Sequence, residues 1–487
     1  MKKNFYLKIL FILILGGLIS SLAILKKPLK ILFDKNLSVP KKKLAIKISL
    51  KSLNFLSFIA CEVYDRKSNQ VVMFYGNKFK SYPKNNFLKK IPESLIPNCD
   101  NPKFNELELN YKKKGDNLKL SKLDDTILSN GLTLERYQFT LGLYAGIANI
   151  YPGSGYIDAD KNNIILLSSK GIISYSSKDN LFEFKQIKNN IDQFININIF
   201  NKNVQFSLKD IAIIKDKIYV SFTEEIKNDC FNTSLLEGTF NYDNIIFKKF
   251  FSPKNCNDIN GGVDKEFNAW QSGGKIIPFD DNNLLLTIGD YRYRGLTQKN
   301  DYVNGKIIKI NTENPNKYKL FSKGHRNPQG LLLDKEKKFI LETEHGPMGG
   351  DEINLLNYTE KNNAIPNYGW PISSAGEHYG GVTKKNDRKY LKYPLYKSHK
   401  DYGYIEPLKS FVPSIGISEI AKVGDNQYVA SSLKDLSLYF FNLDNKNKIK
   451  NMERVEVFER IRDLLFVDKK LFLFMENSPS IGIIKIN

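Results

Sequence analysis

The stretch Asp280-Asp-Asn-Asn-Leu-Leu-Leu-Thr-Ile288 joins a polar turn to a short apolar strand. The same order, polar Asp, Asn, Gln or Lys residues followed by a β-forming run, recurs along most of the chain. The other instances are 160–167, 215–222, 334–341, 424–430 and 468–474. A tight turn that leads into a buried strand is typical of β-hairpins. The pattern therefore predicts an all-β protein built from repeated hairpins.

The spacing of these hairpins predicts how they assemble. They recur at intervals of roughly 45 to 90 residues, which is the scale of a four-stranded propeller blade with loops of varied length. Long amphipathic helices do not alternate with the strands, which argues against a parallel α/β sheet. Six hairpins therefore predict a six-bladed β-propeller. A large β-sandwich is the alternative.

The N-terminus carries an uncharged apolar run at 9–25, with Lys2, Lys3 and Lys8 before it and Lys26 and Lys27 after it. Its length is close to the minimum for a membrane span, and no small-x-small cleavage site follows it. We therefore expect a transmembrane or signal-anchor helix over 1–30. A cleaved signal peptide is the alternative. Residues 31–135 are expected to form an accessory segment, and 136–487 the propeller.

Composition and charge are those of a globular, Lys-rich protein. The formal net charge is +21 and 41% of the residues are hydrophobic. Lys is scattered along the whole chain, whereas a nucleic-acid surface concentrates Lys and Arg with interleaved aromatic residues on one face. Nucleic acid is therefore not expected as a partner. Attraction to an anionic membrane is a secondary possibility.

The four cysteines suggest up to two disulfides if the protein is exported. Proximity in the sequence gives Cys61–Cys99 and Cys230–Cys256 as the pairs, and four unpaired thiols as the alternative. The chain has no CxxC motif and no Cys/His cluster, so the sequence predicts no zinc site of that kind.

Four motifs stand in order within about 55 residues. They are Gly324-His-Arg-Asn-Pro-Gln-Gly330, Glu344-His-Gly-Pro-Met-Gly-Gly-Asp-Glu-Ile-Asn-Leu355, Asn367-Tyr-Gly-Trp-Pro371 and Gly376-Glu-His-Tyr379. This ordered set resembles the glucose/sorbosone dehydrogenase family, the soluble glucose and aldose sugar dehydrogenases that use pyrroloquinoline quinone (PQQ). The resemblance extends more weakly from about residue 145 to the C-terminus.

The resemblance implies a cofactor site and a calcium site. A planar guanidinium binds carboxylate and quinone oxygens in a bidentate manner, and calcium binds oxygen ligands. Carried over residue by residue, the family's PQQ-binding positions fall on Arg326, Asn327, Tyr379, Lys434, Arg460 and Arg462. Its calcium positions fall on Gly346, Pro347, Glu352 and Tyr368.

The family's catalytic histidine has no counterpart here. In the family, this histidine takes the hydroxyl proton while a hydride leaves C1 of the sugar. Anchored on Gly273-Gly-Lys275, its position holds Gln271, or Trp270 with a shift of one residue. Neither side chain titrates near neutral pH. Asp290 and, more weakly, Gln205 match two other polar residues of the family's site.

These observations lead to two functional hypotheses. The first is a PQQ- and calcium-dependent aldose dehydrogenase, membrane-anchored and facing the periplasm or an equivalent exterior, with Gln271, Asp290 and Gln205 at the substrate end. The second is a non-catalytic propeller that binds a sugar at the same place. A scaffold for protein partners has only fold analogy behind it. The sequence gives neither the sugar nor the oligomeric state.

Overall fold

The computed structural model describes residues 60–65, 70–75, 78–83, 115–139, 154–195, 205–261, 264, 266–358, 364–379, 388–476 and 478–486. The chain divides into two units, Met1–Asp100 and Asn101–Asn487. In the first unit, β1 (Ala60–Asp65), β2 (Gln70–Tyr75) and β3 (Lys78–Pro83) form an antiparallel sheet in sequence order.

The second unit is all-β. Its described strands are β4 (Leu118–Lys122), β5 (Thr126–Ile127), β6 (Thr133–Phe139), β7 (Gly155–Ala159), β8 (Asn163–Ser168), β9 (Ile173–Ser177), β10 (Asn180–Asn189), β11 (Leu208–Ile214), β12 (Lys217–Lys227), β13 (Cys230–Thr239), β14 (Asn244–Ile245), β15 (Lys248–Phe251), β16 (Asn257–Asp258), β17 (Gly273–Asp280), β18 (Asn283–Ile288), β19 (Lys306–Asn311), β20 (Lys319–Lys323), β21 (Pro328–Asp334), β22 (Phe339–Glu344), β23 (Asp351–Asn357), β24 (Lys409–Phe411), β25 (Ile417–Lys422), β26 (Gln427–Ser432), β27 (Ser437–Leu443), β28 (Ile449–Glu456), β29 (Ile461–Val467), β30 (Lys470–Met475) and β31 (Ser480–Lys485). The described helices are short: α5 (Arg388–Lys392) and the 3-10 turns η3 (Ile191–Gln193), η5 (Ala269–Gln271), η6 (Arg294–Gln298) and η7 (Lys400–Tyr402).

The hairpins expected from the sequence are confirmed. Each of the six polar turns joins two antiparallel strands, namely β7–β8, β11–β12, β17–β18, β21–β22, β25–β26 and β29–β30. Side chains close these turns. The Asp160 carboxylate, for example, accepts from the backbone N–H groups of Asn162 and Asn163 at 2.9 and 2.8 Å. Polar residues before a β-forming run thus form a turn by themselves, because an Asp side chain bonds to the backbone two residues further on.

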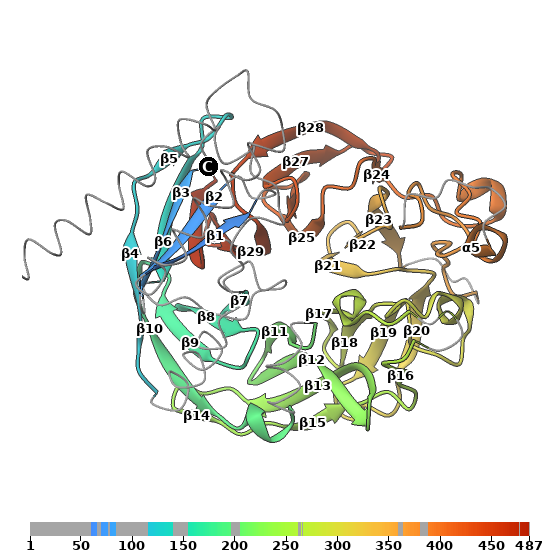
Figure 1. Ribbon diagram of the computed structural model, residues 1–487, viewed down its shortest axis with the longest axis horizontal. Helices are drawn as coiled ribbons and strands as arrows, with labels where there is room; N and C mark the ends of the chain where they lie inside the picture. Colours follow the sequence, from blue (N-terminus) through green and yellow to red (C-terminus); the bar gives the residue numbers. More distant parts are fainter. Residues whose placement is uncertain are drawn as a thin grey trace, which may run out of the picture. The chain divides into compact units, whose positions relative to one another are not determined.

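The sheets of the second unit stand in a ring around a centre (Figure 1). The first strands of the six hairpins, β7, β11, β17, β21, β25 and β29, are the innermost, and each contacts the next in that order until β29 meets β7 again. Consecutive sheets pack face to face, so apolar side chains are buried between them. This arrangement is that of a β-propeller.

The ring is closed by strands from both ends of the second unit. β31 pairs antiparallel with β6, with Ser480 opposite Gln138. β6 also pairs with β4, and β4 with β10, so β29–β31, β6, β4 and β7–β10 belong to one eleven-stranded sheet that also includes β5 and β14. The expected boundary at residue 136 therefore falls inside β6, and β4 and β5 lie in the same sheet as the propeller strands. The boundary itself stays a prediction.

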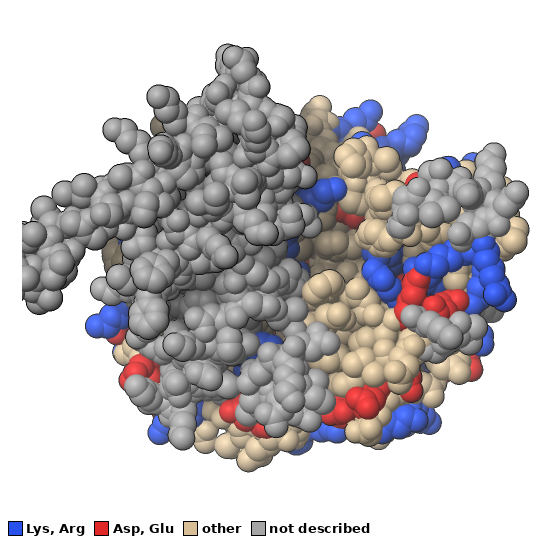
Figure 2. Space-filling model, viewed as in Figure 1, with Lys and Arg blue, Asp and Glu red and all other residues tan. Residues whose placement is uncertain are grey.

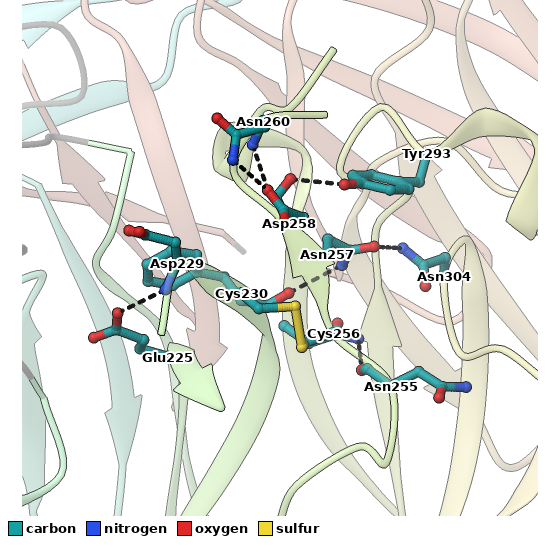
Figure 3. The surroundings of a disulfide bond; sticks show 12 residues. Glu225, Asp229, Cys230, Asn255, Cys256, Asn257, Asp258, Asn260, Tyr293 and Asn304 are labelled. Atoms are coloured by element: carbon teal, nitrogen blue, oxygen red, sulfur yellow. Dashed lines mark hydrogen bonds between the residues drawn. A yellow bond between two sulfur atoms is a disulfide. The ribbon is translucent and has the colours of Figure 1, made fainter. Parts of the chain in front are cut away.

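A disulfide joins the start of β13 to the segment before β16. Cys230 begins β13 and is joined to Cys256, which precedes β16, so this pairing is confirmed (Figure 3). The amide of Asn257 donates to Phe231 O at 3.1 Å and accepts from Asn304 Nδ2 at 2.8 Å. Asn304 Nδ2 also donates to the backbone oxygen of Asp290 at 3.3 Å. The other expected pair includes Cys99, which lies outside the described residues.

The structural finding contradicts the expected membrane-anchored location. In the described ranges, no helix is long and apolar enough to cross a membrane. The apolar run 9–25, on which the expectation rested, lies outside those ranges. The membrane-anchored, exterior-facing location therefore does not stand.

The charged side chains are mixed on the surface that Figure 2 shows. On the described part of this face, Lys and Arg are interspersed with Asp and Glu. Several exposed lysines are paired with carboxylates, among them Lys392 with Asp264 and Lys470 with Asp179. This distribution is that of a solvated surface with charges of both signs.

We expect the disulfide to contribute measurably to stability. Replacing both Cys230 and Cys256 by Ser removes a crosslink across a sequence separation of 26 residues. The chain-entropy relation for a loop of that size gives a loss of about 3–4 kcal/mol in the free energy of unfolding, measured by urea titration. Under reducing conditions the wild type and the double variant should coincide. Equal stability under oxidising conditions would contradict the expectation.

Candidate functional site

A cavity of about 350 Å³ opens at the centre of the ring. All six innermost strands contribute to its wall, with Tyr156 on β7, Asp210 on β11, Lys275 on β17, Gln329 on β21, Glu419 on β25 and Arg462 on β29. Its volume lies in the range of about 300–1,000 Å³ that is usual for ligand sites.

The cavity brings together six of the residues that the sequence singled out. Gln271, Arg326, Asn327, Tyr379, Arg460 and Arg462 line it. Asp290 stands behind Gln271 and is fully buried. The predicted metal residues line a smaller, separate cavity described below. The structure thus gathers residues that are up to about 190 positions apart in the sequence.

The backbone at Gln271 is held by the Thr287-Ile-Gly-Asp290 motif. Gln271 ends η5, whose first residue is capped by the Asn268 side chain, which accepts from Trp270 N at 2.9 Å. The oxygen of Gln271 accepts from Tyr291 N at 3.0 Å. A Cβ on Gly289 would lie 2.1 Å from this oxygen, so only glycine allows the two segments to approach.

The Gln271 side chain contacts three neighbouring side chains. With its amide oriented so that donors face acceptors, Nε2 donates to Asp290 Oδ1 at 2.8 Å, and Oε1 accepts from Arg326 Nη2 at 2.8 Å and from Arg292 Nε at 3.2 Å. Asp290 Oδ2 accepts from Trp370 Nε1 at 2.8 Å. Burial raises the pKa of Asp290, although the Arg326 charge opposes the shift.

Arg326 links the two cavities. Its Nη1 donates to His345 O at 2.8 Å and to Gly346 O at 2.5 Å. Its guanidinium lies over the rings of Trp370 and Tyr379, at 5.5 and 5.6 Å from the centroids. Tyr379 is 48% exposed, so it forms part of the rim of the cavity. Asn327 accepts from Gly273 N at 3.1 Å and holds the start of β17.

Arg460 and Arg462 share one buried carboxylate. Their Nε atoms donate to the two oxygens of Glu476 at 3.1 and 2.7 Å. Glu476 also accepts from Ser154 Oγ at 2.7 Å. The charges of the two arginines lower the pKa of Glu476 against the effect of its burial. Both guanidinium groups thus meet the same carboxylate at the cavity wall.

Besides Asp290 and the predicted metal residues, two predicted residues do not line the central cavity. Lys434 is exposed, and its neighbour Leu433 faces the cavity instead. Gln205 bonds to the loop that carries Gln271, with its Oε1 accepting from Ala269 N at 3.0 Å. Its position is therefore that of a support for this loop. The roles expected for both residues stay predictions.

The floor of the cavity holds a lysine among three carboxylates. The Nζ of Lys275 lies 2.7 Å from Glu419 Oε2, 3.4 Å from Asp210 Oδ1 and 3.5 Å from Asp463 Oδ1. Burial and the neighbouring carboxylates raise the pKa of Asp210 and Glu419, while the lysine lowers it. The carboxylates in turn hold the pKa of Lys275 well above its usual value.

Sequence reasoning missed three cavity residues. Burial, followed by the charge of Arg462, lowers the pKa of Lys209 to about 7. Burial and the nearby arginines lower the pKa of His345 to about 4, and its buried Nε2 has no hydrogen-bond partner among the described residues. Arg292 bonds to Gln271. Arg292 and His345 stand within or beside recognised motifs, whereas no motif marks Lys209.

The four predicted calcium residues lie together. Gly346, Pro347, Glu352 and Tyr368 line a cavity of about 10 Å³, next to Arg326 and Glu344. This volume holds about one small sphere, the size of a single ion or water. Carboxylate and carbonyl oxygens are the donors that a hard cation prefers. The donor set therefore fits a calcium ion.

Comparisons with known proteins agree with the resemblance that the sequence motifs indicated. The family model described as Glucose / Sorbosone dehydrogenase matches residues 179–482. An uncharacterized protein of Synechocystis is 26% identical over 221 residues, 39% of this chain and 50% of that protein. Aldose sugar dehydrogenase YliI of Escherichia coli is 26% identical over 213 residues, 39% of this chain and 53% of that protein. The chain thus spans about half the length of these relatives.

Three further proteins are similar to this chain, over different shares of its length. Quinoprotein glucose dehydrogenase B of Acinetobacter calcoaceticus is 38% identical over 127 residues, 20% of this chain and 25% of that protein. The crystal structure of a glucose dehydrogenase superposes with a TM-score of 0.55 at 20% identity, covering 76% of this chain and 99% of that one. The soluble aldose sugar dehydrogenase of Escherichia coli gives 0.52 at 18% identity, covering 69% and 95%. These structures show a shared fold.

We expect Lys275→Met to destabilise the protein in a pH-dependent way. The change leaves three buried carboxylates without their shared cation, which costs about 3–5 kcal/mol near pH 7. Asp210 and Glu419 have raised pKa values, so above about pH 4 the folded state holds more protons than the unfolded chain, and stability falls as the pH rises. Without Lys275 this fall should be steeper.

Urea unfolding at pH 5, 6, 7 and 8 checks this expectation. The deficit of Lys275→Met should be smallest at pH 5, where protonated carboxylates need no counter-ion. Lys470→Met is the control, because its partner Asp179 is exposed and such pairs contribute about 1 kcal/mol or less. A deficit that is the same at every pH would contradict the proposed role of the lysine.

Proposed function

The chain belongs to the glucose/sorbosone dehydrogenase family, and on this premise we propose that it is a sugar dehydrogenase that oxidises an aldose with PQQ. The single observation that carries the proposal is the charge of the central cavity. Arg326, Arg460 and Arg462 line it together, with one carboxylate, Glu476, shared by two of them. Three guanidinium groups around one cavity suit a quinone that carries several carboxylates.

The residues present fit the cofactor. The three arginines would hold its carboxylates, and Asn327 and Tyr379 would contact it from the side and the rim. The partnerless Nε2 of His345 supports a polar ligand at this wall, since buried polar atoms are rarely left unpaired. Bound PQQ supplies a two-electron acceptor for the hydride that leaves C1 of the sugar.

The sugar hydroxyl must also lose a proton, and Gln271 cannot take it. We propose that Lys209 does. It lines the cavity, and its Nζ lies 3.4 Å from the oxygen of Ala269, two residues before Gln271. With a pKa of about 7, a substantial fraction of this lysine is neutral at neutral pH and able to accept a proton. Gln271, tied to Asp290 and Arg326, would orient the sugar.

Calcium is proposed beside the cofactor. The cavity formed by Gly346, Pro347, Glu352 and Tyr368 has the size and the oxygen donors for one hard cation. Arg326 bonds to the Gly346 carbonyl, so an ion there would touch the same backbone segment that positions this arginine. A bound cation would thereby help to order the cofactor wall.

Six blades are proposed for the ring. Support comes from the cyclic order of β7, β11, β17, β21, β25 and β29. On this interpretation the eleven-stranded sheet comprises two blades, β7–β10 and β29–β31 with β6, which β4 links.

The alternative is a propeller that binds a sugar without oxidising it. One observation favours it: the amide of Gln271 is bonded to Asp290, Arg292 and Arg326. Such a side chain is held in place and does not ionise. Two sets of variants separate the enzyme from the binder.

The first set tests Lys209. Because only the neutral amine accepts a proton, kcat/KM of the PQQ-loaded wild type should rise with pH through about 7. Lys209→Met should lower kcat by about 10²–10⁴ and remove this rise. Lys209→Arg keeps the positive charge without a usable base, so it should lose the activity yet bind PQQ as tightly as the wild type in an absorbance titration. Full activity in both variants would exclude Lys209 as the base.

The second set tests the position of the missing histidine. Gln271→His places an imidazole beside Asp290, and in the Lys209→Met background it should restore a large part of the lost 10²–10⁴. Gln271→Asn is the control, since a shorter amide adds no base. Assays with PQQ, calcium and a panel of aldoses measure the rates. Binding of quinone and sugar without oxidation by any form would support the sugar-binding alternative, and no quinone binding would refute the cofactor proposal.

A further inference from the structure

One buried face of the β21–β24 sheet carries three carboxylates. Glu342 and Glu344 stand two residues apart on β22, so their side chains leave the same face of the sheet. On β23, Glu352 lies directly opposite Glu344, and Asn354 lies opposite Glu342. Like charges directly opposite each other destabilise a sheet. This face therefore calls for a compensating positive charge.

The surrounding protein supplies little compensation. Among the described residues, the ion-pair contacts of Glu342 and Glu344 are the long ones to the imidazole of His325. Glu352 has a contact of 3.5 Å to His399 Nε2. The amide of Asn354 donates to Glu342, Glu344 and Glu352 at 3.0, 3.1 and 3.3 Å, but it carries no charge. The backbone N–H of Arg326 donates to the second oxygen of Glu344 at 2.5 Å.

Two polar atoms in this cluster are left over. Glu342 Oε1 and Asn354 Oδ1 have no hydrogen-bond partner among the described residues, and both side chains are 0% exposed. Buried polar atoms in folded proteins are nearly always paired. The unpaired Glu342 Oε1 is a second observation, independent of the number of acids, that a ligand is missing here. Asn354 presents its nitrogen to the carboxylates, so its Oδ1 would face them only with the amide turned.

The geometry of His325 fits a metal ligand. Its Nε2 lies 2.8 Å from Ser322 Oγ, and its Nδ1 lies 3.4 Å from Glu344 Oε1 and 3.9 Å from Glu342 Oε2. The last two distances are too long for good hydrogen bonds. Two ligand atoms that each stand about 2.1 Å from a tetrahedral ion lie about 3.4 Å apart. A ring nitrogen bonded to a neighbouring oxygen is also the usual support of a metal-bound histidine.

We propose that His325 Nδ1, Glu342 and Glu344 bind a divalent cation of the zinc type, with Asn354 Oδ1 as the fourth ligand once its amide is turned. The three ligand atoms on His325, Glu342 and Glu344 lie within 4.8 Å of one another. Two carboxylates neutralise the two charges of the ion, so the site is neutral overall. An imidazole among the donors favours zinc over calcium or magnesium. The ring of Tyr368, stacked on His325 at 4.8 Å, holds the imidazole in place.

This site is distinct from the one proposed for calcium. The small cavity is lined by Glu344 and Glu352 but not by His325, Glu342 or Asn354. The zinc-type ion would lie on the other side of Glu344, between the two strands and the imidazole. The proposal does not rest on sugar oxidation, because the ion touches neither the central cavity nor Gln271.

Calorimetry on the full-length protein tests the proposal. The protein is stripped of metal with a chelator, returned to excess calcium so that the neighbouring oxygen site is filled, and titrated with zinc. The wild type should bind one tight equivalent. Glu342→Gln, which keeps the shape and removes a ligand charge, should weaken this step by about 100-fold or more. Glu224→Gln is the control, since Glu224 is a buried carboxylate on β12, in another sheet.

Thermal unfolding is a second measurement, and it separates a loss of zinc binding from a failure to fold. Zinc should raise the unfolding temperature of the wild type and of Glu224→Gln but not that of Glu342→Gln or His325→Gln. No tight equivalent in the wild type, or the same equivalent in Glu342→Gln, would overturn the proposal.

Discussion

The innermost strand of each sheet is an edge strand, and the closure of the ring depends on how its free backbone N–H groups are satisfied. Carboxylates from neighbouring inner strands provide the acceptors. Asp158, Asp210 and Asp463 accept from backbone N–H groups of the next strand around the ring, at 2.6, 2.7 and 2.7 Å. The bonds of Asp158 and Asp210 join one sheet to another, and the bond of Asp463 joins β29 to β7 at the two ends of the eleven-stranded sheet. The ring is therefore held at its centre by buried acids.

Buried acids in turn require positive charge, and this requirement shapes the cavity. Lys275 lies among Asp210, Glu419 and Asp463, and it joins three inner strands through one ammonium group. Arg460 and Arg462, which line the same cavity, share Glu476. The centre of the propeller thus combines a buried lysine among carboxylates with arginines at the cavity wall. The charges that stabilise the ring and the arginines proposed to hold a cofactor therefore lie around one cavity.

The sequence by itself determined the local structure and the family. The six hairpins were predictable because a turn is made by side chains within a few residues of each other, as Asp160 shows with its own backbone neighbours. The Cys230–Cys256 pair followed from proximity along the chain. The ordered motifs between Gly324 and Tyr379 indicated the family, which the match over residues 179–482 shows. The membrane-anchored location was inferred from a short apolar run alone, and the structural finding contradicts it.

Only the tertiary structure decided which side chains meet. Gln271 was found from motif spacing, but its bonds to Asp290 and Arg326 depend on three segments that the ring brings together. Lys434, chosen by resemblance, is exposed, whereas Lys209, which no motif marks, lines the cavity. The low pKa of Lys209 and the cluster of buried carboxylates around Glu342 likewise cannot be recognised from the sequence. Burial and electrostatic coupling are sums over neighbours in space, and in a closed ring most of those neighbours are distant in the sequence.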